Sequence, residues 1–224
     1  MALRGRPRGF DRPAALRRAM EVFWRQGYDG TSMVDLTTAM GINSPSLYAA
    51  FGCKEALFRE AVALYGTAEG SASRRALVEQ PTARRAVDAM LRDSALIFAD
   101  QTSPSGCLVT LGAVCGPESE AAVRDHLRER RQEIHDLLRE RLVRAVADGE
   151  LAPATDTEAV AAFYDTVLQG LSLQARDGAS REMLIAIVDC AMAAWDGLTG
   201  QITVAPGAGR ASAAARRSRT SPSS

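Results

Sequence analysis

The cysteines and histidines of this sequence, which could ligate a metal ion or act as nucleophiles, are few and widely spaced. The chain has four cysteines and two histidines: Cys53, Cys107, Cys115, Cys190, His126 and His135. No C-x-x-C pair occurs, and the histidines, nine residues apart, would lie on opposite sides of a helix. No serine, cysteine or carboxylate is arranged with either histidine for acid–base work. We therefore expect no metal site, no cofactor and no enzymatic activity.

Cys53 is the thiol whose position suggests a chemical role, because it precedes an expected helix that begins at Lys54. A helix N-terminus favours the thiolate form, so Cys53 could be oxidised in a redox-sensing regulator. The alternative interpretation is that Cys53 only replaces a small polar capping residue. Cys107 and Cys115 are expected to be small buried hydrophobic residues.

The segment 31–57 predicts two short helices joined by a tight turn. Apolar residues of the first recur at helical spacing: Met33, Leu36 and Met40. Thr31 or Ser32 supplies an oxygen that can cap this helix. Gly41 ends it, since glycine adopts the left-handed conformation of a C-terminal cap at little cost.

The second helix of this segment begins near Ser44, which can cap it, and Pro45 suits the first helical turn. Leu47 and Phe51 are four residues apart and would point together into a small core. Two such helices form a helix-turn-helix, whose second helix lies in the major groove of DNA.

Length, composition and charge are consistent with one DNA-binding end on a larger body. The chain has 224 residues, of which 46% are hydrophobic, and no run of 18 apolar residues. The net charge is +3 over residues 1–60, −7 over 61–200 and +4 over 201–224. No secretory signal or membrane span is expected, and the cytoplasm is the default location.

Hydrophobic spacing predicts helices throughout and no sheet, so the expected fold is all-α with about nine helices. The expected helices are 12–26, the helix-turn-helix, 54–77, 82–100, 106–115, 118–148, 155–176 and 180–198. The expected domains are a flexible basic arm (1–10), a DNA-binding domain (11–60), an effector-binding and dimerisation domain (61–199) and a disordered tail (200–224).

The N-terminal residues resemble the tetracycline-repressor (TetR) family of bacterial transcription regulators over about residues 10–60. The succession that carries the resemblance is Phe23, Gly27-Tyr28, Thr31-Ser32, Gly41, Leu47-Tyr48, Phe51 and Lys54-Glu55. The resemblance implies a homodimer that binds an operator in double-stranded DNA, represses transcription, and releases DNA when an unidentified small molecule enters the C-terminal domain.

The resemblance also implies roles for individual residues. Asn43, Ser44, Pro45 and Ser46 would begin the recognition helix and face base edges or the DNA backbone. By the same resemblance, backbone phosphates would be contacted by Thr31 or Ser32, Tyr48 and Lys54.

Tyr48 and Lys54 each have a structural alternative. Tyr48 could be a packed aromatic, but it lies about 100° around the helix from Leu47, which favours exposure. Lys54 could be an ordinary solvated lysine. A cation at a helix N-terminus is unfavourable by about 0.3–1 kcal/mol, which a bound phosphate would offset.

The last two helices are expected to form a four-helix dimer interface. The residues predicted at this interface are Val167, Leu171, Ile185, Val188, Met192 and Trp195. An effector pocket is expected among residues 82–175, lined by Met90, Phe98, Leu111 and Phe163. Three alternatives remain: a redox regulator that uses Cys53, an interaction scaffold without DNA binding, and an enzyme.

Overall fold

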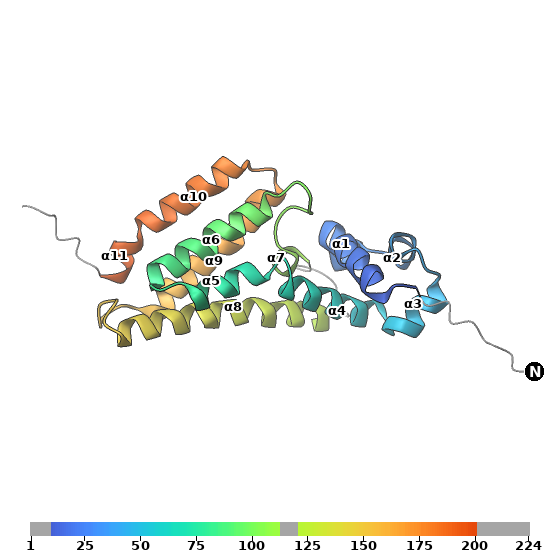
Figure 1. Ribbon diagram of the computed structural model, residues 1–224, viewed down its shortest axis with the longest axis horizontal. Helices are drawn as coiled ribbons and strands as arrows, with labels where there is room; N and C mark the ends of the chain where they lie inside the picture. The colour runs from blue at the N-terminus through green and yellow to red at the C-terminus, as the bar shows by residue number, and fades with distance from the viewer. Residues whose placement is uncertain (1–9, 113–120, 201–224) are drawn as a thin grey trace, which may run out of the picture.

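The computed structural model describes residues 10–112 and 121–200, and these residues form helices and no strand (Figure 1). The all-α prediction is confirmed. Nine helices have at least eight residues, and α7 and α11 are shorter. The helices are α1 (Arg12–Gly30), α2 (Met33–Met40), α3 (Ser44–Phe51), α4 (Lys54–Thr67), α5 (Ser71–Glu79), α6 (Ala83–Phe98), α7 (Leu108–Leu111), α8 (Ala121–Ala147), α9 (Thr157–Arg176), α10 (Arg181–Ala193) and α11 (Trp195–Thr199).

Local capping determines where the first three helices begin and end. Ser32 and Asp35 form a reciprocal capping box at the start of α2. Gly41 ends α2 in the left-handed conformation, as the sequence predicts. The cap of α3 differs from the prediction, because Asn43 rather than Ser44 accepts the hydrogen bond from the backbone of Ser46. Helices α1, α2 and α3 are called the head below.

The head has a hydrophobic core that continues into the rest of the molecule. Leu36 and Met40 of α2 and Leu47 and Phe51 of α3 are at most 3% exposed and pack with aromatic residues of α1 and α4. The same cluster includes Ala61, Val62, Tyr65, Leu108, Val123 and Leu127. The boundary predicted at residue 60 therefore falls inside α4, which is shared between the head and the body.

Three expected helices are interrupted, and the one expected over 180–198 divides at Ala194 into α10 and α11. The helix expected over 54–77 breaks between Thr67 and Ser71, whose hydroxyls donate to the carbonyls of Leu64 and Ala68. The helix expected over 106–115 includes only Leu108–Leu111 of the described residues, and 113–115 lie outside them. Gly106 cannot join it, because its φ is +79° and an added Cβ would lie 2.6 Å from the carbonyl oxygen of Ser172.

Four hydrogen bonds join the C-terminal end of α1 to the body. The Trp24 indole donates to the carbonyl of Gly106 at 3.0 Å, and the Tyr28 backbone N–H donates to the carbonyl of Gly112 at 2.7 Å. The guanidinium of Arg176, at the end of α9, donates to the carbonyls of Trp24 at 2.7 Å and Arg25 at 3.0 Å. The segment 106–112 and the end of α9 therefore fix the position of the head.

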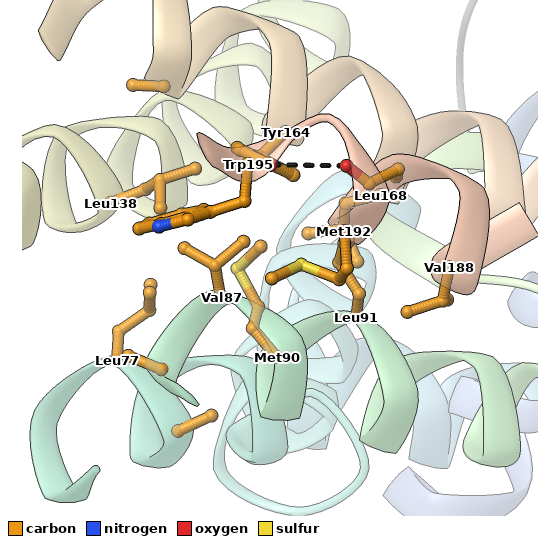
Figure 2. Close-up of a cluster of buried hydrophobic side chains, with 14 of the residues drawn as sticks. Leu77, Val87, Met90, Leu91, Leu138, Tyr164, Leu168, Val188, Met192 and Trp195 are labelled. Atoms are coloured by element: carbon orange, nitrogen blue, oxygen red, sulfur yellow. Dashed lines mark hydrogen bonds between the residues drawn. The ribbon is translucent and has the colours of Figure 1, made fainter. Parts of the chain in front are cut away.

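The body is a bundle built around α6, α8, α9 and α10, with its own hydrophobic core (Figures 1 and 2). Trp195 and Tyr164 are fully buried in this core, and the Tyr164 hydroxyl donates to the carbonyl of Ala191. None of the described helices combines the length and the hydropathy that a membrane crossing requires.

The joint between head and body predicts that Gly27→Ala destabilises the protein. Gly27 has φ +73° and ψ 174°, a conformation almost restricted to glycine, and an added Cβ would lie 3.2 Å from the carbonyl oxygen of Gly112. We expect a loss of about 1–3 kcal/mol in the free energy of unfolding, measured by urea denaturation.

The matched control is Gly66→Ala within α4, where an added Cβ has no neighbour within 4 Å. This change should be neutral or stabilising by up to about 1 kcal/mol. Equal stability of the two variants would contradict the close approach of Gly27 to the segment 106–112.

Candidate nucleic-acid interface

The start of α3 presents an exposed edge on the head. Asn43, Ser44 and Pro45 are exposed, Ser46 is half-buried, and the Tyr48 side chain is 51% exposed. Leu47, about 100° around the helix from Tyr48, is fully buried. Burial of that side orients the polar side outward, so α3 has the geometry of a helix that can enter a groove.

The Asn43 side chain fixes the start of this edge. Its Oδ1 accepts a hydrogen bond from the Ser46 backbone N–H at 2.9 Å. Asn43 therefore caps the helix, and the predicted base contacts of the edge rest on Ser44, Pro45 and Ser46, which follow it.

Thr31 does not lie on this surface. It is 2% exposed, and its hydroxyl donates to the carbonyl of Gly27 at 2.6 Å. The prediction that Thr31 meets the DNA backbone is therefore wrong in this conformation, because the Thr31 side chain is buried and its hydroxyl is bonded within the chain. Ser32 is exposed, as a phosphate contact requires, although its hydroxyl donates to Asp35 at 2.6 Å.

Asp35 brings a negative charge to the start of α2. The hydrogen bonds from the Ser32 hydroxyl and backbone lower the pKa of the Asp35 carboxyl, which is therefore ionised at neutral pH. A phosphate near Ser32 would meet this charge. The start of α4 also has an acidic residue, Glu55, but Lys54 places a positive charge beside it, which the start of α2 lacks.

Lys54 has an aromatic neighbour that sequence analysis missed. Its ammonium lies 4.2 Å from the centroid of the Tyr28 ring, and burial lowers the pKa of Lys54 while nearby Asp29 raises it. The ring holds the ammonium at the start of α4, beside the exposed Cys53. Contact with phosphate stays a prediction that this position supports.

Arg12 is a second residue whose role could not be read from spacing. Its guanidinium donates to the carbonyl of Ala50 at 3.2 Å and to both carboxylate oxygens of Glu60 at 2.8 Å, and it covers the Phe51 ring at 4.3 Å. These contacts join the start of α1 and the end of α3 to α4. Arg12 therefore positions α3.

The comparisons agree with a DNA-binding head on a helical body. Residues 15–61 match the model of bacterial regulatory proteins of the tetR family. Residues 81–184 match the model of the tetracyclin repressor-like C-terminal domain. The transcriptional repressor ComR of Escherichia coli K12 is 33% identical over 193 residues, which cover 86% of this chain and 92% of ComR. The chain belongs to the TetR family of transcriptional regulators.

Solved structures of other TetR-family regulators have the same fold. A cysteine-substituted variant of the regulator CifR, complexed with 26-base-pair double-strand operator DNA, is 52% identical, with a TM-score of 0.82. That match covers 85% of this chain and all of the CifR chain. A TetR-type regulator from Rhodococcus is 38% identical, with a TM-score of 0.55, over 83% of this chain and 97% of that one.

The body of this TetR-family chain contains a cavity of about 350 Å³. It lies between α4, α5, α6, α8, α9 and the segment 106–112, and its wall is mainly apolar. Apolar residues from these elements include Val62, Ala72, Phe98, Val109, Ile134 and Leu168. Polar groups reach it as well, among them Arg131 and Asp165, and burial raises the pKa of Asp165.

Of the four residues predicted to line a pocket, only Phe98 lines this cavity. Met90 is fully buried in the body core with Trp195 and Met192 (Figure 2). Phe163 is 38% exposed on the surface of α9, and Leu111 packs against Gly106. The prediction misplaced these three because spacing along one helix does not tell which neighbouring helix a residue faces.

Four of the six residues predicted at the dimer interface are buried within the single chain. Leu171, Val188 and Trp195 are fully buried within the single chain, Met192 is 7% exposed, and Val167 and Ile185 are half-buried. Fully buried side chains offer no surface to a partner. The exposed residues of α9 and α10 include charged ones, such as Glu158, Glu182 and Asp189, and a set of small and apolar ones, called the exposed face below: Ala159, Ala162, Phe163, Thr166, Gly170, Leu173, Met183, Ala186, Cys190 and Ala193.

The position of Lys54 predicts that Lys54→Ala weakens binding to all DNA sequences alike. Loss of one phosphate contact should reduce the slope of log affinity against log salt by about one unit. Fluorescence anisotropy with a labelled duplex at several salt concentrations measures this slope.

The control is Arg144→Ala, which removes one exposed positive charge in the last turn of α8, at the end of the body far from the head (Figure 1). Its slope should equal that of the unchanged protein. An unchanged slope for Lys54→Ala would remove Lys54 from the set of phosphate contacts.

Proposed function

We propose that this TetR-family protein is a dimeric repressor that binds a near-palindromic operator and is released by a small molecule. The exposed start of α3 would read bases, and Tyr48 and Lys54 would contact the DNA backbone. The effector would bind in the cavity of the body.

The observation that carries the DNA-binding proposal is the contrast between the two sides of α3. Leu47 is fully buried, whereas Ser44 and Pro45 are exposed and Tyr48 is 51% exposed on the outer side. The relatives support this reading, since ComR is named a repressor and the CifR structure contains operator DNA. Repression is proposed rather than activation by analogy with ComR.

The exposed face of α9 and α10 supports the proposed dimer. Small residues along this face let two helix pairs approach closely, and Leu173 and Met183 would be covered by the partner. The α3 helices of the two heads in a symmetric dimer would enter successive major grooves about 34 Å apart. The operator would therefore be a near-palindrome.

Release would depend on α4. Val62 and Tyr65 of α4 line the cavity, while Leu57 and Phe58 of the same helix pack into the core of the head. An effector that prefers a shifted α4 would change the separation of the two heads. Its differential affinity for the two conformations sets how strongly DNA is released.

Selection of bound duplexes from randomised DNA tests the function directly. We expect enrichment of two related half-sites in inverted orientation, and we expect Ser44→Ala or Ser46→Ala to alter the enriched bases. Binding without sequence preference, or no salt-sensitive binding at all, would contradict the proposed function and favour a scaffold.

The dimer proposal predicts that Gly170→Glu produces folded monomers. An added Cβ at Gly170 has no neighbour within 4 Å in the single chain, so glutamate fits the isolated subunit. In a dimer it would bury charge between two helices. Sedimentation velocity should show the monomer, and operator affinity should fall by at least about tenfold.

Ala147→Glu, at the exposed end of α8, adds the same charge and should leave the dimer intact. A Gly170→Glu protein that remains dimeric would place the interface elsewhere.

A redox regulator that uses Cys53 is the second candidate. Cys53 is exposed at the start of α4, and its sulfur accepts a hydrogen bond from the Ala56 backbone at 3.4 Å. Oxidation there would place a bulkier group beside Lys54. If Cys53→Ser abolishes oxidant-induced release of DNA, this candidate holds; if release persists, it fails.

A further inference from the structure

Two residues in the wall of the body cavity each have a buried polar atom without a protein partner. The Oε2 of Glu69 and the Nε of Arg130 are shielded from solvent and form no hydrogen bond within the part of the chain that the structure describes. Glu69 reaches the cavity from the segment between α4 and α5, and Arg130 reaches it from α8. We propose that the ligand of this cavity is an alcohol, an apolar molecule whose hydroxyl group Glu69 and Arg130 recognise. This names the ligand class of the proposed effector site, and it rests on the proposed function for its consequence on DNA.

The carboxylate of Glu69 has one engaged oxygen and one that is left over. Its Oε1 accepts a hydrogen bond from the guanidinium of Arg17, on α1, at 3.4 Å. Its Oε2 is the buried atom. Most buried polar atoms in proteins are hydrogen-bonded, because an acceptor without a donor keeps the cost of losing its water. A ligand that donates to Oε2 removes this cost.

The hydroxyls of the same wall have already donated their protons. Thr67 and Ser94 each donate to a backbone carbonyl of their own helix, at 2.9 and 2.6 Å. Because a hydroxyl has one proton, the 3.0 Å hydrogen bond between Ser73 and Ser94 uses the proton of Ser73. None of these three protons is available to Glu69, so a donor for its Oε2 has to come from a ligand or from water.

The charges of the wall are balanced, which favours a neutral ligand. Three arginines and three acidic residues line the cavity: Arg74, Arg130, Arg131, Glu69, Glu133 and Asp165. The Glu133 carboxylate lies 2.6 Å from the guanidinium of Arg130 and 3.6 Å from that of Arg74. A ligand with a fixed charge would enter this balanced wall without a counter-charge of its own and would lose its water.

Among neutral groups, a hydroxyl matches both unpartnered atoms. It donates to an acceptor such as Oε2 of Glu69 and accepts from a donor such as Nε of Arg130. An ammonium only donates, and an ether oxygen only accepts. An alcohol therefore replaces water at such atoms without the loss of a hydrogen bond, whereas the other two groups leave one atom unpaired. The apolar side chains of Ile97, Phe98 and Leu168 would bind the hydrocarbon part.

The contact between Glu69 and Arg17 connects this recognition to the head. The two side chains are 25% and 51% exposed, so their ion pair is weak. A Glu69 carboxylate that turns toward a ligand would give up this contact at little cost. Helix α1 would then lose one of its contacts with the body, and DNA binding would weaken.

The test compares three probes of equal size with the full-length protein in the absence of DNA: n-octanol, octylamine and heptyl methyl ether. Isothermal titration calorimetry measures the three dissociation constants. We expect n-octanol to bind at least about tenfold more tightly than either of the other two, because each of those leaves a buried polar atom unpaired. Ether binding as tight as alcohol binding, tighter binding of octylamine, or no binding of n-octanol would overturn the proposal.

Variants assign the preference to the two residues. Glu69→Leu removes the acceptor and should abolish the preference for n-octanol over the ether, whereas Glu69→Gln, which keeps a carbonyl oxygen, should retain part of it. Arg130→Met should abolish the preference over octylamine. Glu79→Leu, at the exposed last residue of α5, removes the same charge outside the cavity and should leave both preferences unchanged.

Unchanged preferences in Glu69→Leu and Arg130→Met would overturn the assignment to these residues. Circular dichroism checks that each variant folds. If Glu69→Leu does not fold, an unreduced preference in Glu69→Gln decides against Glu69.

A second measurement adds operator DNA. We expect n-octanol to lower the operator affinity of the unchanged protein by at least about fivefold and to leave that of Glu69→Leu unaffected. If n-octanol binds with the expected preferences but operator affinity does not change, release in the proposed function fails while the assignment of the ligand class holds. If the protein binds no DNA at all, the proposed function fails, and the calorimetric ranking still decides whether the cavity selects alcohols.

Discussion

The hydrogen bonds between the segment 106–112 and the end of α1 are the constraint on which the rest of the structure depends. The carbonyls of Gly106 and Gly112 accept from Trp24 and Tyr28, at 3.0 and 2.7 Å. These bonds restrict the movement of α1 relative to the segment 106–112, because a buried donor or acceptor left without a hydrogen bond costs about 1–3 kcal/mol. The orientation of the head therefore follows the position of this segment.

Helix α4 forms the second connection between head and body. Its Phe58 packs edge-on against Phe23 of α1, and its Tyr65 packs edge-on against Trp24 with ring centroids 4.9 Å apart. Tyr65 also lines the cavity. One side of the cavity wall is thus made of the elements that hold the head, so a ligand there can bias the head without touching it.

Sequence analysis predicted what depends on local spacing. The turn at Gly41 and the inward positions of Leu36, Leu47 and Phe51 follow from helical periodicity and glycine conformation, and the structure has them. Contacts between residues distant in sequence were missed. Lys54 contacts Tyr28, which lies 26 residues earlier in the sequence, and Arg12 contacts Glu60, which lies 48 residues later.

The outward face of α9 and α10 shows a different limit. Large apolar residues such as Trp195 and Val188 were expected at a dimer interface, but the chain buries them in its own core. Small residues such as Gly170 remain outside. Residue size alone favours the core, because a large side chain gains more from complete burial. The partner-facing side can then be recognised only after the core is known.

Hydrogen–deuterium exchange of the full protein, with and without operator DNA, tests the central claim most directly. The first backbone N–H groups of a helix lack backbone partners within the helix. Side chains cap the N–H groups of Ser46 and Ala56, so those of Ser44, Lys54 and Glu55 should exchange more readily in the free protein. The account predicts that DNA slows exchange at residues 43–48 and 53–56 and leaves the exposed face of α9 and α10 unchanged. Protection confined to the body, with none at the start of α3, would contradict it.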